Sequence, residues 1–259
     1  MILARGPLQF IGSSNDLINI SSQGSGNGLV VLNANVESTF KNVVFKNLGA
    51  PREKGWGLTG AITFYKSPIN ITRCSFIENN SEDSINILNS DFRIDNSDFS
   101  TSKSDALDVD FGSGVISNVI FKNIGNDAID ISGSNVFLNN IKVDGAGDKA
   151  ISVGEKSYMK ITNLEIRNAS IGIASKDMST VETKGISIDS TKLAFTAFQK
   201  KPEYGPASLI IQDSKKLVTS RVYLLESPST IVLDAKPLPP NVKKVEEYLY
   251  GVLYGRSSK

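Results

Sequence analysis

The chain has 259 residues, of which 40% are hydrophobic, enough to bury the core of one large globular domain or two small ones. It has no histidine and one cysteine, which excludes histidine-based catalysis, histidine zinc sites, internal disulfides and cysteine metal clusters. Its 28 basic and 27 acidic residues leave a net charge of +1, which argues against nucleic acid as a partner.

Residues 1–35 are expected to form one or two irregular coils, and a regular repeat follows them. Short segments of alternating apolar residues recur along the chain, and their last residues form a column: Phe45, Phe76, Phe99, Phe121, Val143, Ile166 and Ile188. Five of the six steps in this column are 22 or 23 residues long, and the first step is 31. A second column keeps nearly the same step at Ile62, Ile85, Leu107, Ile129, Ile151, Ile173 and Phe195.

These columns predict an all-β fold, a single-stranded right-handed parallel β-helix of roughly nine coils with one repeat per coil. The alternating β-branched residues indicate strands, and the motif and helical return of leucine-rich repeats are not found. Coils of such a solenoid stack about 4.8 Å apart. Ile129 and Ile131 are therefore expected to point inward onto Leu107 and Val109, with Asp130 pointing outward.

An asparagine column precedes one set of strands, at Asn42, Asn96, Asn118, Asn140 and Asn163. Asparagine tolerates left-handed backbone angles, and its amide can bond the like amide of the next coil. The column therefore predicts a bend at the same place in each of these coils.

The 31-residue step contains an extra segment, residues 49–58, which is predicted to be a loop extruded from one coil. It holds the single tryptophan, Trp56. We favour a ring that folds back over apolar surface, and the alternative is a platform on which a sugar stacks. Tyr65 and Tyr158 are further candidates for stacking on sugar, and Arg167 could steer an anionic ligand.

Acidic residues occupy matching places in adjacent coils of the second column. The matching pairs are Asp83 with Asn86, Asp105 with Asp108, Asp127 with Asp130, and then Lys149 with Ser152. Carboxylates on neighbouring coils repel one another unless a cation neutralises them, and both Ca²⁺ and Lys149 could do so. This acid column is therefore the main candidate for chemistry in the sequence.

Three interpretations of the acid column stay open. Asp108 and Asp130 could bind Ca²⁺ in a catalytic patch with Lys149 as base, by analogy with β-helices that cleave acidic polysaccharides. Asp127 and Asp130 could be the general acid and base of a glycosidase, although a polygalacturonase would also carry a Gly-His-Gly motif. We favour the third interpretation, in which the aspartates are turn formers on a solvated face.

The repeat fades near residues 208–212 and 230–234, so the β-helix is predicted to span residues 1–235. Residues 236–259 form a tail in which residues 241–254 are predicted to be helical, with Asn241 as the N-cap. A solenoid needs a cover on its last exposed rung, so this helix is expected to be a cap.

Several longer motifs resemble the β-helix module found C-terminal to CotH-type (spore-coat-protein-H-like) kinase domains in bacterial surface proteins. The matching words are Trp56–Tyr65, Gly125–Ser134, Gly147–Glu155, Ile171–Asp177 and Phe198–Ala207. The resemblance covers roughly residues 5–212. It implies a pectin-lyase-like β-helix on an exported protein, and it carries no catalytic residues.

We therefore expect a non-catalytic extracytoplasmic module that binds polysaccharide or supports a neighbouring domain of a longer polypeptide. The module is expected to be monomeric, without membrane insertion and without a signal peptide in this chain. The alternative is a Ca²⁺-assisted polysaccharide lyase or hydrolase that uses Asp105, Asp108, Asp127 and Asp130, with Lys149 as base. A lyase requires a lowered Lys149 pKa, whereas a structural role predicts an ion pair.

Overall fold

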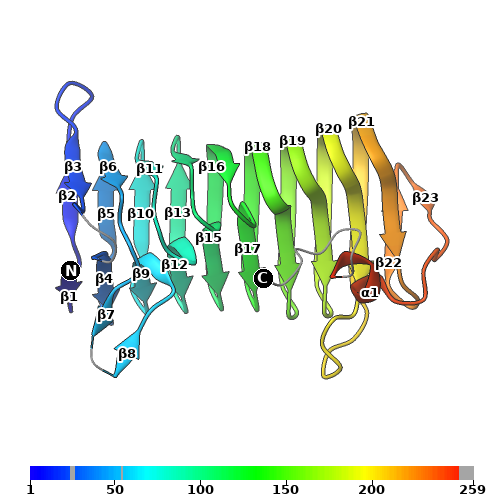
Figure 1. The fold of residues 1–259 in the computed structure, drawn as a ribbon, viewed down its shortest axis with the longest axis horizontal. Helices are drawn as coiled ribbons and strands as arrows, with labels where there is room; N and C mark the ends of the chain where they lie inside the picture. Colours follow the sequence, from blue (N-terminus) through cyan, green and yellow to red (C-terminus); the bar gives the residue numbers. More distant parts are fainter. Residues whose placement is uncertain (24–26, 54, 251–259) are drawn as a thin grey trace.

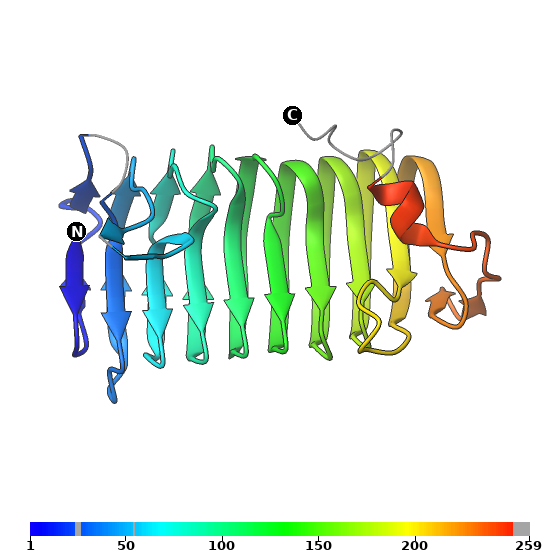
Figure 2. The same ribbon diagram turned by 60° about the horizontal axis from the view of Figure 1, so that its bottom comes forward.

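The computed structural model describes residues 1–23, 27–53 and 55–250 of the chain. The described residues form a parallel β-helix in which each coil passes through three sheets, here named faces A, B and C (Figures 1 and 2). Nine successive parallel pairings connect ten rungs of face A within the described residues. The predicted fold is thus confirmed, with one rung more than the repeat suggested.

Face A contains the second sequence column. Its strands are β1 (Ile2–Ala4), β4 (Leu29–Leu32), β9 (Gly60–Tyr65), β12 (Asp83–Leu88), β15 (Asp105–Asp110), β17 (Ile129–Ser132) and the last segments of β18 (Asn135–Gly154), β19 (Tyr158–Lys176), β20 (Thr180–Phe198) and β21 (Ser208–Leu225). The strands β18 to β21 are long because they continue around the corners of the coil.

Face B follows face A in each coil. It consists of β2 (Gln9–Ile11), β5 (Ser38–Lys41), β10 (Ile69–Thr72), β13 (Asp91–Asp95), the first segments of β16 (Ser113–Ile124) and of β18 to β21, and β22 (Thr230–Leu233). Face C consists of β3 (Ile18–Ser21), β6 (Val43–Lys46), β11 (Ser75–Ile77), β14 (Asp98–Ser100) and the later segments of β16 and β18 to β21.

The core lies between the three faces and repeats from rung to rung. Ile129 and Ile131 are fully buried and pair with Leu107 and Val109, as predicted. On face C, the rings of Phe45, Phe76, Phe99 and Phe121 stack with centroids 5.1, 4.6 and 4.9 Å apart. These separations match the rung spacing of about 4.8 Å, so each ring packs on the one before it.

Two corners of the coil are fixed by side chains. At the corner between faces B and C, all five predicted asparagines adopt left-handed backbone angles, with φ between 48° and 57°. The Asn140 amide donates to Asn118 Oδ1 at 2.8 Å, which confirms the predicted bond between like amides at this pair. At the corner between faces A and B, buried serine hydroxyls accept backbone N–H bonds from the previous rung, at Ser67, Ser90, Ser134, Ser157, Ser179 and Ser229.

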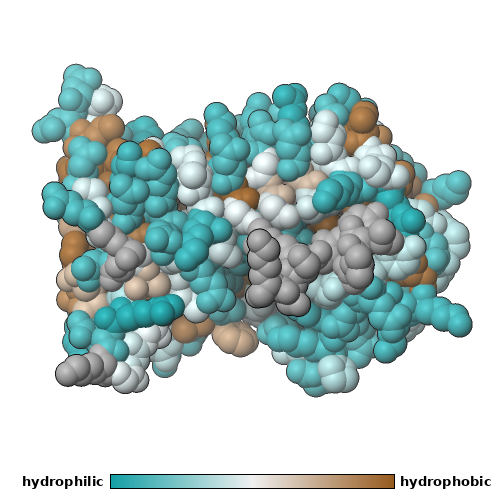
Figure 3. All heavy atoms as spheres, viewed as in Figure 1, coloured by the Kyte–Doolittle hydropathy of each residue, from teal (hydrophilic) through white to brown (hydrophobic). Residues whose placement is uncertain are grey.

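The two ends of the solenoid differ. The first rung has a neighbour on one side, and Ile2, Leu3, Ile11 and Leu17 are exposed there, at the end where Figure 3 shows hydrophobic atoms. At the other end, β22 pairs with the antiparallel strand β23 (Lys236–Pro237), and Leu238 packs against the core.

The predicted C-terminal helix is present but shorter, α1 (Val245–Leu249), with Lys244 rather than Asn241 at its N-cap. Asn241 instead accepts a hydrogen bond from Leu225 N and donates one to Tyr223 O, so it ties the tail to β21. Val245 and Leu249 pack against Leu193 and Leu224, so α1 covers the flank of the last rungs. Residues 251–254 of the predicted helix lie outside the described residues.

Candidate functional site

The 31-residue step builds a hairpin that overhangs one corner of the solenoid (Figure 1). Strands β7 (Arg52–Glu53) and β8 (Trp56–Gly57) pair antiparallel, and Gly55 adopts a φ of +88° in the turn between them. That backbone angle favours glycine because a side chain would be strained there. The extra residues thus form a short hairpin of their own beside the rungs.

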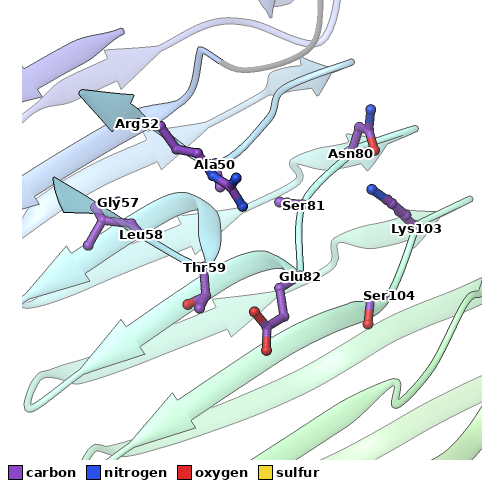
Figure 4. Close-up of a pocket in the computed structure, with 10 residues that line it drawn as sticks. All are labelled: Ala50, Arg52, Gly57, Leu58, Thr59, Asn80, Ser81, Glu82, Lys103 and Ser104. Carbon is purple, nitrogen blue, oxygen red and sulfur yellow. The ribbon is translucent and has the colours of Figure 1, made fainter. Parts of the chain in front are cut away.

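A groove of about 740 Å³ lies beneath this hairpin, where face C passes into face A (Figure 4). The hairpin, the residues before β9, and the corner residues of the next two rungs line it: Ala50, Arg52, Gly57, Leu58, Thr59, Asn80, Ser81, Glu82, Lys103 and Ser104. The groove therefore runs across consecutive rungs, along the solenoid axis.

Two cations dominate the electrostatics of the groove. The side chains of Arg52 and Lys103 point into it from opposite sides (Figure 4). Neither forms an ion pair with any residue that the structure describes. Glu82 is the acidic side chain in the lining, and Thr59, Asn80 and Ser104 add hydroxyl and amide groups. The two cations outnumber Glu82, so an anion that entered the groove would meet a net positive charge.

Trp56 lies on the hairpin and is 43% exposed. Its partner across the hairpin is Glu53, whereas the neighbouring pair, Arg52 and Gly57, lines the groove. Because side chains alternate along a strand, the indole belongs to the side of the hairpin opposite Arg52. That its ring folds back over apolar surface stays a prediction. This exposure is what a sugar-stacking ring requires.

The other three predicted ligand-binding residues do not join Trp56. Tyr65 is the last residue of β9, at the opposite end of the strand from the groove. The Lys66 ammonium lies over its ring, 5.4 Å from the centroid. Tyr158 lies on the outer side of face B. Arg167 is exposed on face C, in register between Asp144 and Asp189. The structure thus distributes these residues over three faces.

The acid column lies along face A, and its members differ in role. Asp105 Oδ1 accepts bonds from the Asp127 backbone N–H at 2.8 Å and from the Asn126 amide at 2.7 Å. Asp127 Oδ1 in turn accepts the Lys149 backbone N–H at 2.8 Å. Asp105 and Asp127 therefore fasten the start of each rung to the next, which is a structural role.

Lys149 does not have the properties of a base. Its side chain is 6% exposed, and its ammonium lies 3.4 Å from Asp127 Oδ2 and also contacts Asp148. These two carboxylates raise the pKa of Lys149 above its usual value, although burial alone would lower it. A lysine base needs a lowered pKa, so the structure argues against the predicted role of Lys149 in a lyase.

Asp108 and Asp130 are the acids of the column that face outward on adjacent rungs. Asn86 donates to Asp108 Oδ2 at 2.8 Å, and Asp130 Oδ1 lies 3.9 Å from the ammonium of Lys176. Burial, followed by the charge of Asp83 and other aspartates, raises the pKa of Asp108 to about 9. At neutral pH this pair therefore presents a protonated carboxyl beside a second carboxyl group.

The predicted calcium site at Asp108 and Asp130 is not supported. Within the described ranges, no group of three or more acidic side chains is arranged to hold a metal ion. Asp110 lies near Asp108 and Asp130 on the same side of face A, but these carboxyl groups are not arranged as a metal site, and Ca²⁺ takes six to eight oxygen ligands. Neutralisation comes instead from protonation of Asp108 and from Lys176 beside Asp130.

Nothing in the sequence pattern singles out Arg52, Glu82 or Lys103. The long step marked the extruded loop, but Lys103 lies more than forty residues beyond it in the chain. These residues become neighbours because the corners of successive rungs stack beneath the hairpin (Figure 4).

Comparison with known proteins shows similarity in fold. No protein-family model and no curated protein matches the chain. Tailspike protein 2 of Escherichia coli O157:H7 bacteriophage CAB120 matches with a TM-score of 0.57 and 12% identity, covering 90% of this chain and 38% of the tailspike. The catalytic domain of a GH87 alpha-1,3-glucanase in complex with tetrasaccharides matches with a TM-score of 0.46 and 12% identity, covering 93% and 63%.

The tailspike likeness supports a parallel β-helix and nothing finer. This chain spans 38% of the tailspike and 63% of the glucanase domain. The resemblance to modules that accompany CotH-type kinase domains stays a prediction, because no family model matches. No helix among the described residues is long and apolar enough to span a membrane.

Proposed function

We propose that this chain is a non-catalytic carbohydrate-binding β-helix whose groove beneath the β7–β8 hairpin holds an acidic polysaccharide. One observation carries the proposal: two cations without ion-pair partners among the described residues, Arg52 and Lys103, point into one groove beneath the β7–β8 hairpin. The guanidinium of Arg52 can donate two parallel bonds to a sugar carboxylate. Lys103 adds a second positive charge from a corner of a later rung.

The geometry suits an extended polymer. The groove crosses rungs that repeat at about 4.8 Å, comparable to the length of one sugar unit in an extended chain. Thr59, Asn80 and Ser104 can exchange hydrogen bonds with sugar hydroxyls. The tailspike likeness supports the scaffold, while the ligand class rests on the groove.

The same proposal includes the setting of the module. We place it outside the cytoplasm, as a monomeric part of a longer surface polypeptide, where it binds polysaccharide or positions a neighbouring domain. This setting rests on the motif resemblance at Trp56–Tyr65 and Gly125–Ser134.

Native gel electrophoresis through sodium alginate, with dextran as a neutral polymer, tests the groove. Alginate is expected to retard the wild-type protein more than dextran does. The double variant Arg52→Ala/Lys103→Ala should weaken alginate binding by about tenfold or more, a loss of about 1.4 kcal/mol. Trp56→Ala, on the other side of the hairpin from Arg52, should weaken it less. Lys122→Gln removes an exposed lysine on face C and should bind like the wild type. Equal retardation of all four proteins would refute the assignment of the groove.

A second candidate function is hydrolysis of a glycosidic bond by Asp108 and Asp130. The observation in its favour is a carboxyl group with a pKa of about 9 beside a second carboxyl on the next rung. A protonated carboxyl can donate a proton to the leaving oxygen while the other acts as base or nucleophile. Asp105, Asp127 and Lys149 are not needed for this chemistry.

Chromatographic sizing of polysaccharides after incubation separates the two functions. Neutral and acidic polymers would be incubated with the protein, with and without a chelator. The binding proposal expects intact polymer throughout. Shortening that disappears in Asp108→Asn and in Asp130→Asn, but persists in Asp144→Asn on face C, would establish an enzyme and refute the non-catalytic assignment.

A further inference from the structure

An aromatic pair stands on the outer side of face B, far from the groove. Phe137 is 42% exposed in the middle of the first segment of β18. The ring of Tyr158, on the next rung, meets it edge-on, with centroids 6.3 Å apart and planes at 70°. Outward positions of a solenoid sheet are usually polar, so an exposed phenylalanine at this place calls for a partner.

The neighbouring side chains hold the pair in place. The Tyr158 hydroxyl interacts with Glu182, which lies one rung further along. Glu182 is in register with Lys160, and Lys160 is in register with Phe137. The edge contact with Phe137 restrains the tyrosine ring, so less conformational entropy would be lost when a ligand contacts it.

A shallow groove of about 350 Å³ continues from the aromatic pair along the same face. Its lining includes Lys160, Thr162, Glu182, Lys184, Ile210 and Gln212. Lys160 and Glu182 carry opposite charges at paired positions, which nearly cancel locally, and Lys184 is the other charged residue of the lining. Hydroxyl, amide and charged groups therefore lie between the aromatic pair at one end of this surface and Ile210 at the other.

We infer that this surface, Phe137 and Tyr158 with the adjoining groove, is a second saccharide-binding site, and that its ligand is an uncharged glucan chain. Sugar rings present apolar C–H faces to aromatic rings and hydroxyls to polar neighbours, which is the pattern on this face. The centre of a protein–protein interface is depleted in lysine and glutamate, whereas Lys160 and Glu182 cross this patch. A flat sheet face suits a linear polymer better than a compact small molecule.

The second site is independent of the groove beneath the hairpin. Face B lies across the core from the corner between faces C and A, and the two sites use different rungs. A single short oligosaccharide cannot occupy both sites. A chain with two separate sites can bridge two polymers, and its apparent affinity for a long or mixed polymer can exceed that of either site.

Native gels containing hydroxyethyl cellulose test this inference separately from the alginate experiment. The wild-type protein and Trp56→Ala should be retarded equally, since Trp56 lies on the β7–β8 hairpin and not on face B. Phe137→Ala and Tyr158→Ala should each lose about tenfold in affinity, and Phe137→Trp should retain binding. Phe111→Ala, which removes a phenylalanine that is 64% exposed at the corner between faces A and B, is the matched control.

Two results would overturn the inference. One is wild-type protein that hydroxyethyl cellulose does not retard, which would favour a protein partner for this surface. The other is equal retardation of the wild type and Phe137→Ala. Failure of alginate binding with retained cellulose binding would refute the proposed groove and leave this second site standing.

Discussion

Asp127 and Lys149 form a buried ion pair across two neighbouring rungs of face A. The Lys149 ammonium lies 3.4 Å from Asp127 Oδ2, and the Lys149 backbone N–H donates to Asp127 Oδ1 at 2.8 Å. The side chains are 6% and 4% exposed. Lys149, the predicted base of a lyase, therefore has a structural role in the sheet. Asp127 accepts its backbone N–H and pairs with its ammonium.

Asp127→Ala should therefore destabilise the fold strongly. Removal of one partner leaves a buried lysine charge with Asp148 alone, and losses of about 3–5 kcal/mol are typical for such a change. Urea unfolding followed by circular dichroism measures the difference in the free energy of unfolding. Glu165→Gln breaks the exposed pair with Lys142 and should cost no more than about 1 kcal/mol. Equal losses of unfolding free energy in the two variants would show that the buried pair stabilises the fold no more than the exposed pair does.

The acid column makes stability depend on pH in an unusual direction. Burial raises the pKa of Asp83 to about 7 and that of Asp108 to about 9. In the unfolded chain these groups release their protons near pH 4. Between about pH 4 and pH 9 the folded state binds more protons than the unfolded state, so the free energy of unfolding should fall as the pH rises.

Thermal melting between pH 4.5 and pH 9 tests this direction. Melting temperature should fall across the range, and Asp108→Asn should flatten the part above about pH 7, where Asp83 has already titrated. The amide keeps an oxygen that can accept the bond from Asn86. A wild-type melting temperature that rises toward pH 9, or an unchanged slope in Asp108→Asn, would contradict the assignment.

The repeat in the sequence predicted most of the fold because a solenoid needs only local regularity. Each 22-residue step places the same residue types over one another, so Ile129 packs on Leu107 without any long-range information. The asparagine bends followed from the backbone tolerance of one residue type. The alternating pattern also separated Ile131 inside from Asp130 outside.

The groove could not be predicted because it depends on a departure from the repeat. The extra residues at 49–58 marked a loop, but their hairpin pairing and the exposure of Trp56 are tertiary features. The position of α1 was equally hidden, because Val245 and Leu249 can bury their side chains on the flank or on the end of the solenoid. The pKa of Asp108 depends on burial, which the sequence does not show.

The asparagine bends give a test of backbone conformation alone. Asn140 has a φ of 56°, where glycine is relaxed and alanine is strained by roughly 1–2 kcal/mol. Asn140→Ala should therefore lower the free energy of unfolding by about that amount, and Asn140→Gly should lower it much less. Asn139→Ala, at the preceding exposed position of face B, is the control and should be near neutral. Similar losses for alanine and glycine at position 140 would assign the effect to the amide bond with Asn118.

The serine corner was not foreseen, because serine is common in this sequence and its spacing was masked by the other columns. Ser134 Oγ accepts the Gly112 backbone N–H at 2.9 Å and donates to Ser132 O at 2.8 Å, inside the coil. Ser134→Ala would leave a buried backbone N–H without its acceptor, which costs about 1–3 kcal/mol. Ser113→Ala, at an exposed position of face B, should change stability by less than about 0.5 kcal/mol. Urea unfolding of the two variants compares them directly, and a neutral Ser134→Ala would mean that the corner hydroxyls follow the fold rather than stabilise it.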